Sequence, residues 1–114
     1  MDNIPTDIKE VLDRFTGECI NMLGNRVKKI ILYGSYARGD YNNSSDIDIL
    51  ILTDYEREEC YNAFKKISEM TYGLDLEYDV ILMPLINNIN DFNNGVECVP
   101  FYINVQKEGI ILKE

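Results

Sequence analysis

The sequence contains no histidine among its 114 residues. This absence excludes serine and cysteine hydrolases of the usual triad kind, zinc sites with histidine ligands, and proton shuttling by histidine. Cysteine is sparse as well: Cys19, Cys60 and Cys98 are far apart, form no C-x-x-C pair and lie among apolar neighbours. We expect all three to be small buried hydrophobic residues without a disulfide framework, as in a reducing cytoplasm.

Basic residues are outnumbered by acidic ones. Eleven Lys and Arg stand against 20 Asp and Glu, which gives a formal net charge of −9. The longest basic runs are two residues, at Lys28–Lys29 and Lys65–Lys66. Because binding to a nucleic-acid backbone depends on clustered cations, we expect no direct binding of nucleic acid.

Long apolar runs are also missing. No run approaches the length that spans a membrane, and residues 1–10 are polar and acidic, unlike a secretion signal. We therefore expect a cytoplasmic protein without a membrane segment. Hydrophobic residues make up 46% and charged residues 27%, typical of one globular domain over residues 1–114. An enzyme of this length has no room for a separate substrate domain, so it would depend on a partner or on its substrate.

The spacing of apolar residues predicts an alternation of helices and strands. Apolar residues at helical spacing follow Pro5 and predict a first helix that ends at Gly24. The further predicted elements are strands over 27–33 and 46–53, a short helix at 36–38, a helix over 55–72 ended by Gly73, a strand over 74–83, a short helix over 85–92, a helix from Pro100 to Gly109, and a strand over 110–112. This order predicts an α+β fold, in which helices flank a small mixed β-sheet.

Two aspartates lie two residues apart at the start of the second predicted strand. Asp46 and Asp48 should project from the same face of that strand. Two like charges among apolar neighbours repel each other and favour protonation unless a cation compensates. Oxygen ligands without histidine or C-x-x-C favour a hard divalent ion, above all Mg²⁺. The alternative is an exposed strand whose polar face carries two aspartates by chance.

The turn before these aspartates is suited to bind phosphate. Gly34 and Ser35 directly follow a predicted strand, so backbone N–H groups and the Ser35 hydroxyl can face an anion. Arg38 lies in the same turn and can reach a phosphate oxygen. The alternative is an ordinary Gly-Ser turn, and the loop is not a Walker A motif because no Gly-Lys-Ser/Thr follows. The turn and the paired carboxylates together favour a metal-dependent nucleotide site.

The run Gly34-Ser35-x-Ala-Arg-Gly followed by Ser45-Asp-x-Asp resembles the signature of the polymerase-β-like nucleotidyltransferase superfamily. The sequence is most similar to its minimal nucleotidyltransferase branch, which often serves as the antitoxin of HEPN-type ribonuclease toxins. The resemblance implies a polymerase-β-like nucleotidyltransferase fold, with ATP as the nucleotide substrate and Mg²⁺ as the cofactor. It also implies that Gly34, Ser35 and Arg38 hold the triphosphate.

The resemblance further implies a catalytic, metal-binding set of three carboxylates. Asp46 and Asp48 would be two of them, and the family places a third on a later strand, as base or metal ligand. We expect Asp79 in that role because it leads into an aliphatic stretch, Val80 to Leu82. Asp75, Glu77 and Asp79 share one face of the predicted strand over 74–83. Glu77 is therefore the rival, and an exposed acidic strand face is the remaining alternative.

The activity implied is that of a protein adenylyltransferase antitoxin. It would transfer AMP from ATP to a tyrosine of a cognate HEPN-type toxin and release pyrophosphate. An acidic surface suits a basic, RNA-cleaving partner. One alternative is an antitoxin that neutralises the toxin by binding alone. Another is a small-molecule nucleotidyltransferase, although such enzymes carry an additional helical domain.

Overall fold

The computed structural model describes residues 4–114, and four strands and five α-helices follow one another along that part of the chain. The elements are α1 (Thr6–Leu23), the short 3₁₀ helix η1 (Gly24–Arg26), β1 (Val27–Tyr33), α2 (Ser35–Arg38), β2 (Ile47–Thr53), α3 (Arg57–Tyr78), β3 (Leu82–Asn88), α4 (Ile89–Gly95), α5 (Pro100–Glu108) and β4 (Ile110–Lys113). Helices and strands alternate in the predicted order, and the α+β prediction is confirmed. Residues 1–3, part of the segment in which we expect no secretion signal, lie outside the described residues.

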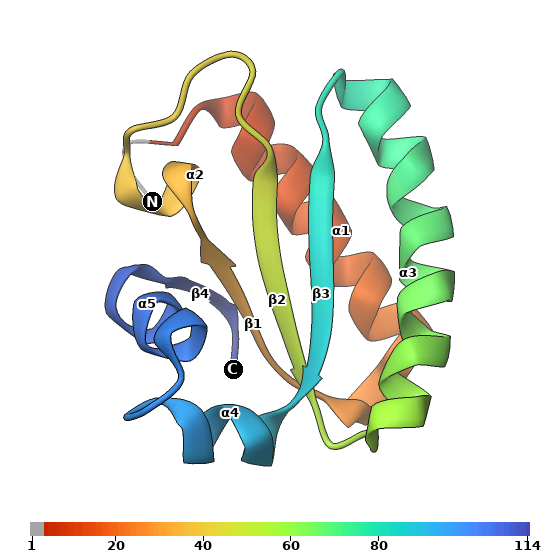
Figure 1. Cartoon of the computed structure of the whole chain (residues 1–114). Coiled ribbons are helices and arrows are strands. Elements are labelled where there is room, and N and C mark those ends of the chain that lie inside the picture. Colours follow the sequence, from red (N-terminus) through yellow and green to blue (C-terminus); the bar gives the residue numbers. More distant parts are fainter. Residues whose placement is uncertain (1–3) are drawn as a thin grey trace.

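The strands form one mixed sheet in the order β3-β2-β1-β4 (Figure 1). β1 runs antiparallel to β2 and β4, whereas β2 and β3 are parallel and are joined by α3. In the β1–β2 register, Tyr33 lies opposite Asp48. The turn that follows β1 therefore lies at the same edge of the sheet as the start of β2.

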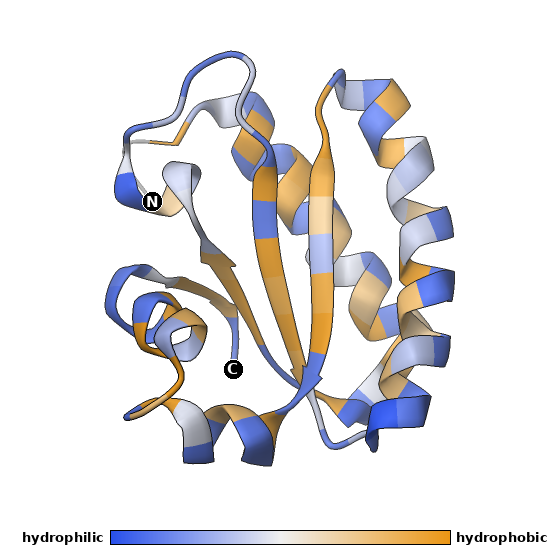
Figure 2. Ribbon diagram, in the orientation of Figure 1, coloured by the Kyte–Doolittle hydropathy of each residue, from blue (hydrophilic) through white to orange (hydrophobic). Residues whose placement is uncertain are grey.

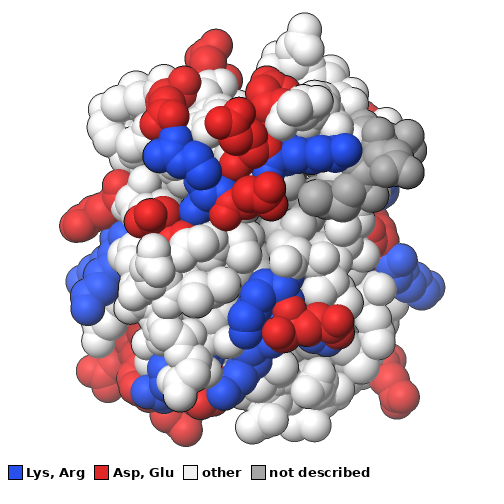
Figure 3. Space-filling view, turned by 180° about the vertical axis from the view of Figure 1, so that it is seen from behind, with Lys and Arg blue, Asp and Glu red and all other residues white. Residues whose placement is uncertain are grey.

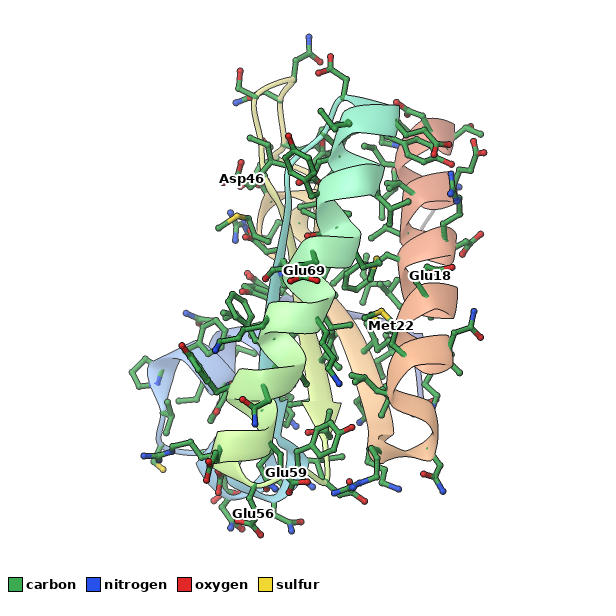
Figure 4. All side chains as sticks on the ribbon, turned by 90° about the vertical axis from the view of Figure 1, so that its right-hand side faces the viewer. Glu18, Met22, Asp46, Glu56, Glu59 and Glu69 are labelled. Carbon is green, nitrogen blue, oxygen red and sulfur yellow. The ribbon has the colours of Figure 1, made fainter. Side chains whose placement is uncertain are left out.

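Helices pack on both faces of the sheet. α1 and α3 lie together on one face, as the side view in Figure 4 shows. On that face, Ile47, Ile49 and Ile51 of β2 are buried against α1 and α3, with Phe15 and Ile67 fully buried among them. On the other face, a second cluster joins the sheet to α4 and α5: Ile31, Leu50, Leu52, Phe92 and Val105. Each such side chain contributes roughly 1.5–3 kcal/mol on burial, so both layers stabilise β2. Figure 2 shows β2 as apolar along its length except near its start.

The second face is only partly covered. α4 and α5 lie over one half of this face, and no helix of residues 4–114 lies in front of the upper part of β2 and β3 in Figure 1, whereas α1 passes behind them. On this uncovered side, Ile81, Met83 and Leu85 are 54%, 47% and 41% exposed, while Leu82 and Ile86 point into the core. We call these three residues the apolar strip.

The chain between residues 73 and 81 differs from the prediction. Gly73 does not end the helix, because α3 continues to Tyr78, and the strand expected over 74–83 is wrong. Leu74 is buried, and its burial offsets the roughly 1 kcal/mol that a glycine costs inside a helix. The helix ends at Asp79, which has a positive φ of 55°, and the Leu82 N–H donates to the Asp75 carboxylate at 2.9 Å.

The following helix was also predicted too early. The helix expected over 85–92 is present but begins four residues later, since β3 extends to Asn88 and α4 begins at Ile89. Pro84 lies inside β3, where a proline is tolerated because β3 is at the edge of the sheet. The Asn88 side chain then accepts hydrogen bonds from the backbone N–H groups of Asn90 and Asp91 and begins α4.

The three cysteines differ in their exposure to solvent. Cys19 and Cys60 are buried as predicted, but Cys98 is exposed, so the prediction that all three are buried is wrong. Residue 98 lies in the turn between α4 and α5, outside both packed layers.

Seen from behind, the described surface carries acidic and basic side chains side by side without one large basic patch (Figure 3). No helix within residues 4–114 is both long enough and apolar enough to cross a membrane.

Candidate functional site

The turn after β1 is built around Gly34. Its backbone has φ 78° and ψ −156°, a conformation that essentially only glycine adopts. A Cβ at this position would overlap Oδ2 of Asp48 and lie 3.2 Å from its Cγ. The absence of a side chain therefore lets the turn pass directly beside the Asp48 carboxylate. The short helix α2 follows, and its Arg38 N–H donates to the Gly34 carbonyl at 3.0 Å.

The two predicted aspartates differ in their surroundings. Asp48 lies on β2 and is half-buried, whereas Asp46 precedes β2 by one position, is exposed and is labelled in Figure 4. Burial is the largest cause that raises the pKa of Asp48, followed by the Asp46 charge; Glu108 also raises it, and Arg38 lowers it. The two aspartates therefore interact, and a bound cation would relieve their repulsion.

A pocket of about 360 Å³ brings most of the predicted site together. Gly34, Ser35, Arg38 and Asp48 all line it, so four of the six site residues expected from the sequence share one cavity. The opposite wall comes from α5 and includes Phe101, Asn104 and Glu108. Asp46 and Asp79 do not line this pocket.

No motif in the sequence points to Glu108, although this residue contacts the predicted phosphate-binding turn. Its Oε1 accepts a hydrogen bond from the Gly34 N–H at 3.2 Å and one from Nη1 of Arg38 at 3.2 Å. Its Oε2 accepts from the same Nη1 at 3.4 Å. Asp40 binds the other side of the guanidinium, accepting from Nε of Arg38 at 3.2 Å. The antiparallel pairing of β1 with β4 places the end of α5 beside this turn, and no local motif signals that pairing.

The later carboxylates do not lie on a strand. The interpretation of Asp75, Glu77 and Asp79 as one strand face is wrong, because the first two are in α3 and Asp79 ends it. Glu77 is exposed and forms an ion pair with Arg14 of α1.

Asp79 is exposed and lines a separate hollow of about 250 Å³, together with Ser44, Ser45 and Ile81. The residue of β3 that lies directly beside Asp48 is Met83, which cannot act as a base. Asp79 therefore adjoins the segment that leads to Asp46 without reaching the pocket of Asp48.

The donor set at Asp46 and Asp48 is compatible with Mg²⁺. Within residues 4–114, no group of three or more His, Cys, Asp or Glu side chains could hold a metal ion by itself. Mg²⁺ usually keeps several waters and is bound by one or two carboxylates together with substrate phosphates. An interacting pair of aspartates beside a phosphate-binding turn fits that mode of binding, and the chemistry is hard oxygen ligation.

A larger hollow of about 420 Å³ lies elsewhere, between α3, the end of β3 and the helices that follow. Its lining includes Cys60, Tyr61, Phe64 and Tyr102, with Asp91 as its one carboxylate. Its lining has no carboxylate pair and no glycine turn, unlike the predicted site around the pocket of about 360 Å³.

Comparison with known proteins identifies the family of the chain. The family model described as "Nucleotidyltransferase domain" matches residues 12–112. A protein of Methanocaldococcus jannaschii named "putative protein adenylyltransferase" is 35% identical over 104 residues, covering 91% of this chain and 96% of that relative.

Two crystal structures share the fold. One is of a "putative nucleotidyltransferase" from Sulfolobus solfataricus, with TM-score 0.53, 19% identity, and coverage of 92% of this chain and 80% of that one. The other is of a toxin–antitoxin with AMP-PNP, with TM-score 0.51, 17% identity, and coverage of 88% and 71%. The predicted fold, a mixed sheet flanked by helices, is therefore confirmed.

Proposed function

The chain belongs to the nucleotidyltransferase domain family, and we propose that it is an antitoxin that transfers AMP from ATP to a tyrosine of a HEPN-type toxin. The observation that carries the proposal is the pocket in which Gly34, Ser35 and Arg38 face the Asp48 carboxylate. An anion-binding turn beside metal-binding carboxylates is what transfer of a nucleotide requires.

In this proposal the chain's own groups bind and orient the nucleotide. The Gly34 N–H, the Ser35 hydroxyl and the Arg38 guanidinium bind phosphate oxygens. Asp46 and Asp48 would hold Mg²⁺, which would supply neutralising charge for the triphosphate.

The reaction forms a bond between the tyrosine oxygen and the α-phosphorus and breaks the bond to the β-phosphate, so pyrophosphate leaves. The phenolic proton passes to a carboxylate, for which we retain Asp79 as the proposed acceptor or further metal ligand. Its position beside Ser45, at the start of the Asp46 segment, is what supports that role.

The choice of acceptor rests on similarity and charge. A relative is named "putative protein adenylyltransferase", and a structural neighbour is a toxin–antitoxin with AMP-PNP. A formal net charge of −9 also suits association with a basic partner in the cytoplasm.

An antitoxin that acts by binding alone is the second candidate. Met83 favours this candidate, because the residue of β3 beside Asp48 is a methionine and not a third carboxylate. In that case a stable complex would form and the toxin would be inhibited without any covalent change.

Intact-mass spectrometry distinguishes the two. The protein encoded beside this chain's gene is incubated with this chain, ATP and Mg²⁺, in parallel with Asp48→Asn and with Asp91→Asn as a matched control from the other hollow. We expect a gain of AMP units with wild type and Asp91→Asn, none with Asp48→Asn, and a modified tyrosine on peptide mapping. Inhibition and complex formation without a mass gain would reject transfer in favour of binding.

A further inference from the structure

The groups proposed to bind the nucleotide's phosphate are already bound to an anion of the chain itself. Gly34 has one backbone N–H, and that N–H donates to Oε1 of Glu108 at 3.2 Å. The same oxygen accepts from Nη1 of Arg38 at 3.2 Å. A carboxylate oxygen and a phosphate oxygen are both anionic acceptors, so they make the same kind of charge-assisted hydrogen bond with these donors.

The Gly34 N–H has one hydrogen to donate, so it cannot form a strong hydrogen bond with two such anions at the same time. A phosphate oxygen placed on it would also meet the negative charge of Glu108 at short range. Asp48 adds to this electrostatic repulsion of phosphate, since Glu108 and Asp48 line the same pocket and both carry negative charge. Glu108 and a nucleotide phosphate are therefore competitors for one position.

We propose that Glu108 is an internal ligand of the phosphate-binding turn, which a nucleotide phosphate must displace. The proposal rests on the assignment of that turn to phosphate binding. Glu108 is the last residue of α5, and its side chain is 23% exposed, so it can rotate into solvent without moving the helix. Until then it supplies an anionic partner to Gly34 and Arg38 and keeps the turn formed.

The affinity for nucleotide follows from this competition. The measured dissociation constant equals the intrinsic constant divided by the fraction of molecules in which Glu108 has left the turn. Removing the carboxylate removes that penalty and should tighten binding of a phosphate group. If Glu108 were instead a metal or substrate ligand, removing it would weaken binding.

The test compares Glu108→Gln and Glu108→Ala with wild type by isothermal titration calorimetry. The probes are inorganic tripolyphosphate and α,β-methylene-ATP, each with Mg²⁺, so that the phosphate group is tested with and without a nucleoside. Asp40→Asn is the matched control, because Asp40 also binds the Arg38 guanidinium but does not touch the Gly34 N–H. The amide proton of Gly34 is followed by NMR in the free proteins, to confirm that its hydrogen bond is lost in Glu108→Ala.

We expect Glu108→Ala to bind both probes roughly tenfold more tightly than wild type, with Glu108→Gln between them and Asp40→Asn close to wild type. Weaker or unchanged binding in Glu108→Ala would overturn the proposal, even if wild type proves to be an adenylyltransferase. Tighter tripolyphosphate binding in Glu108→Ala would uphold it, even if no variant transfers AMP. No binding of either probe by any variant would refute both the internal ligand and the proposed function.

Discussion

Replacing Gly34 with alanine should damage both the fold and the site, and the structure separates the two causes. The backbone at Gly34 has φ 78° and ψ −156°, where an L-residue costs of the order of 1–3 kcal/mol. The new Cβ would also overlap the Asp48 carboxylate, and forced overlap in a packed region typically costs about 1–3 kcal/mol more. Asp48 can relieve the overlap only by turning away from the pocket.

Urea denaturation measures the damage to the fold, and the transfer assay measures the damage to the site. We expect the free energy of unfolding to fall by roughly 2–6 kcal/mol, the sum of both costs, and transfer to fall on the order of a hundredfold as Asp48 is displaced. Gly73→Ala is the control, since no heavy atom lies within 4 Å of its added Cβ in α3. The free energy of unfolding of that variant should rise by up to about 1 kcal/mol, and its transfer activity should be unchanged.

A double variant isolates the overlap with Asp48. In an Asp48→Ala background, Gly34→Ala should cost only the backbone part, because the carboxylate that it would meet is gone. Equal stability of Gly34→Ala and wild type would refute the conformational argument. An undiminished cost in the Asp48→Ala background would refute the overlap.

Three further predictions concern ionisable side chains. The surroundings of Asp48 raise its pKa above 3.8, so ionisation of this carboxylate opposes folding. Asp48→Asn should therefore raise the free energy of unfolding at neutral pH. Urea titrations should show that this gain in stability vanishes as the pH falls below about 3.8. Asp79→Asn should lower transfer less than Asp48→Asn, since Asp79 is exposed and outside the pocket; equal losses in a rate assay would contradict this. Thiol titration of the native protein should find one fast-reacting cysteine, the exposed Cys98, because Cys60 is buried and burial raises the pKa of Cys19 to about 12; denaturation should expose all three.

Much of the site could be predicted because it is local in sequence. β1 and β2 are consecutive antiparallel strands, so the turn that leaves one necessarily lies beside the start of the other. Gly34 and Asp48 therefore meet without any knowledge of the remaining topology. The boundaries of α1, β1 and β2 followed from apolar runs between strong punctuating residues.

The rest depended on packing between distant segments. Gly73 and Pro84 are local signals for an end of structure, but burial of Leu74 and the edge position of β3 outweighed them. Glu108 meets Gly34 across 74 positions of sequence, through the pairing of β4 with β1. A single sequence carries no periodicity that reports such a pairing.

The apolar strip has a consequence for the chemistry beside it. Met83 adjoins Asp48 on the sheet and is 47% exposed, and Asp46 is exposed as well, so solvent borders the two aspartates on this side. In a nucleotide transfer, that water is a rival nucleophile whose product is free AMP. An acceptor protein seated over the strip would expel it, as closure does in other active sites. The preference for a hydroxyl over water would then be a property of the assembled pair, and the free chain should slowly hydrolyse its nucleotide.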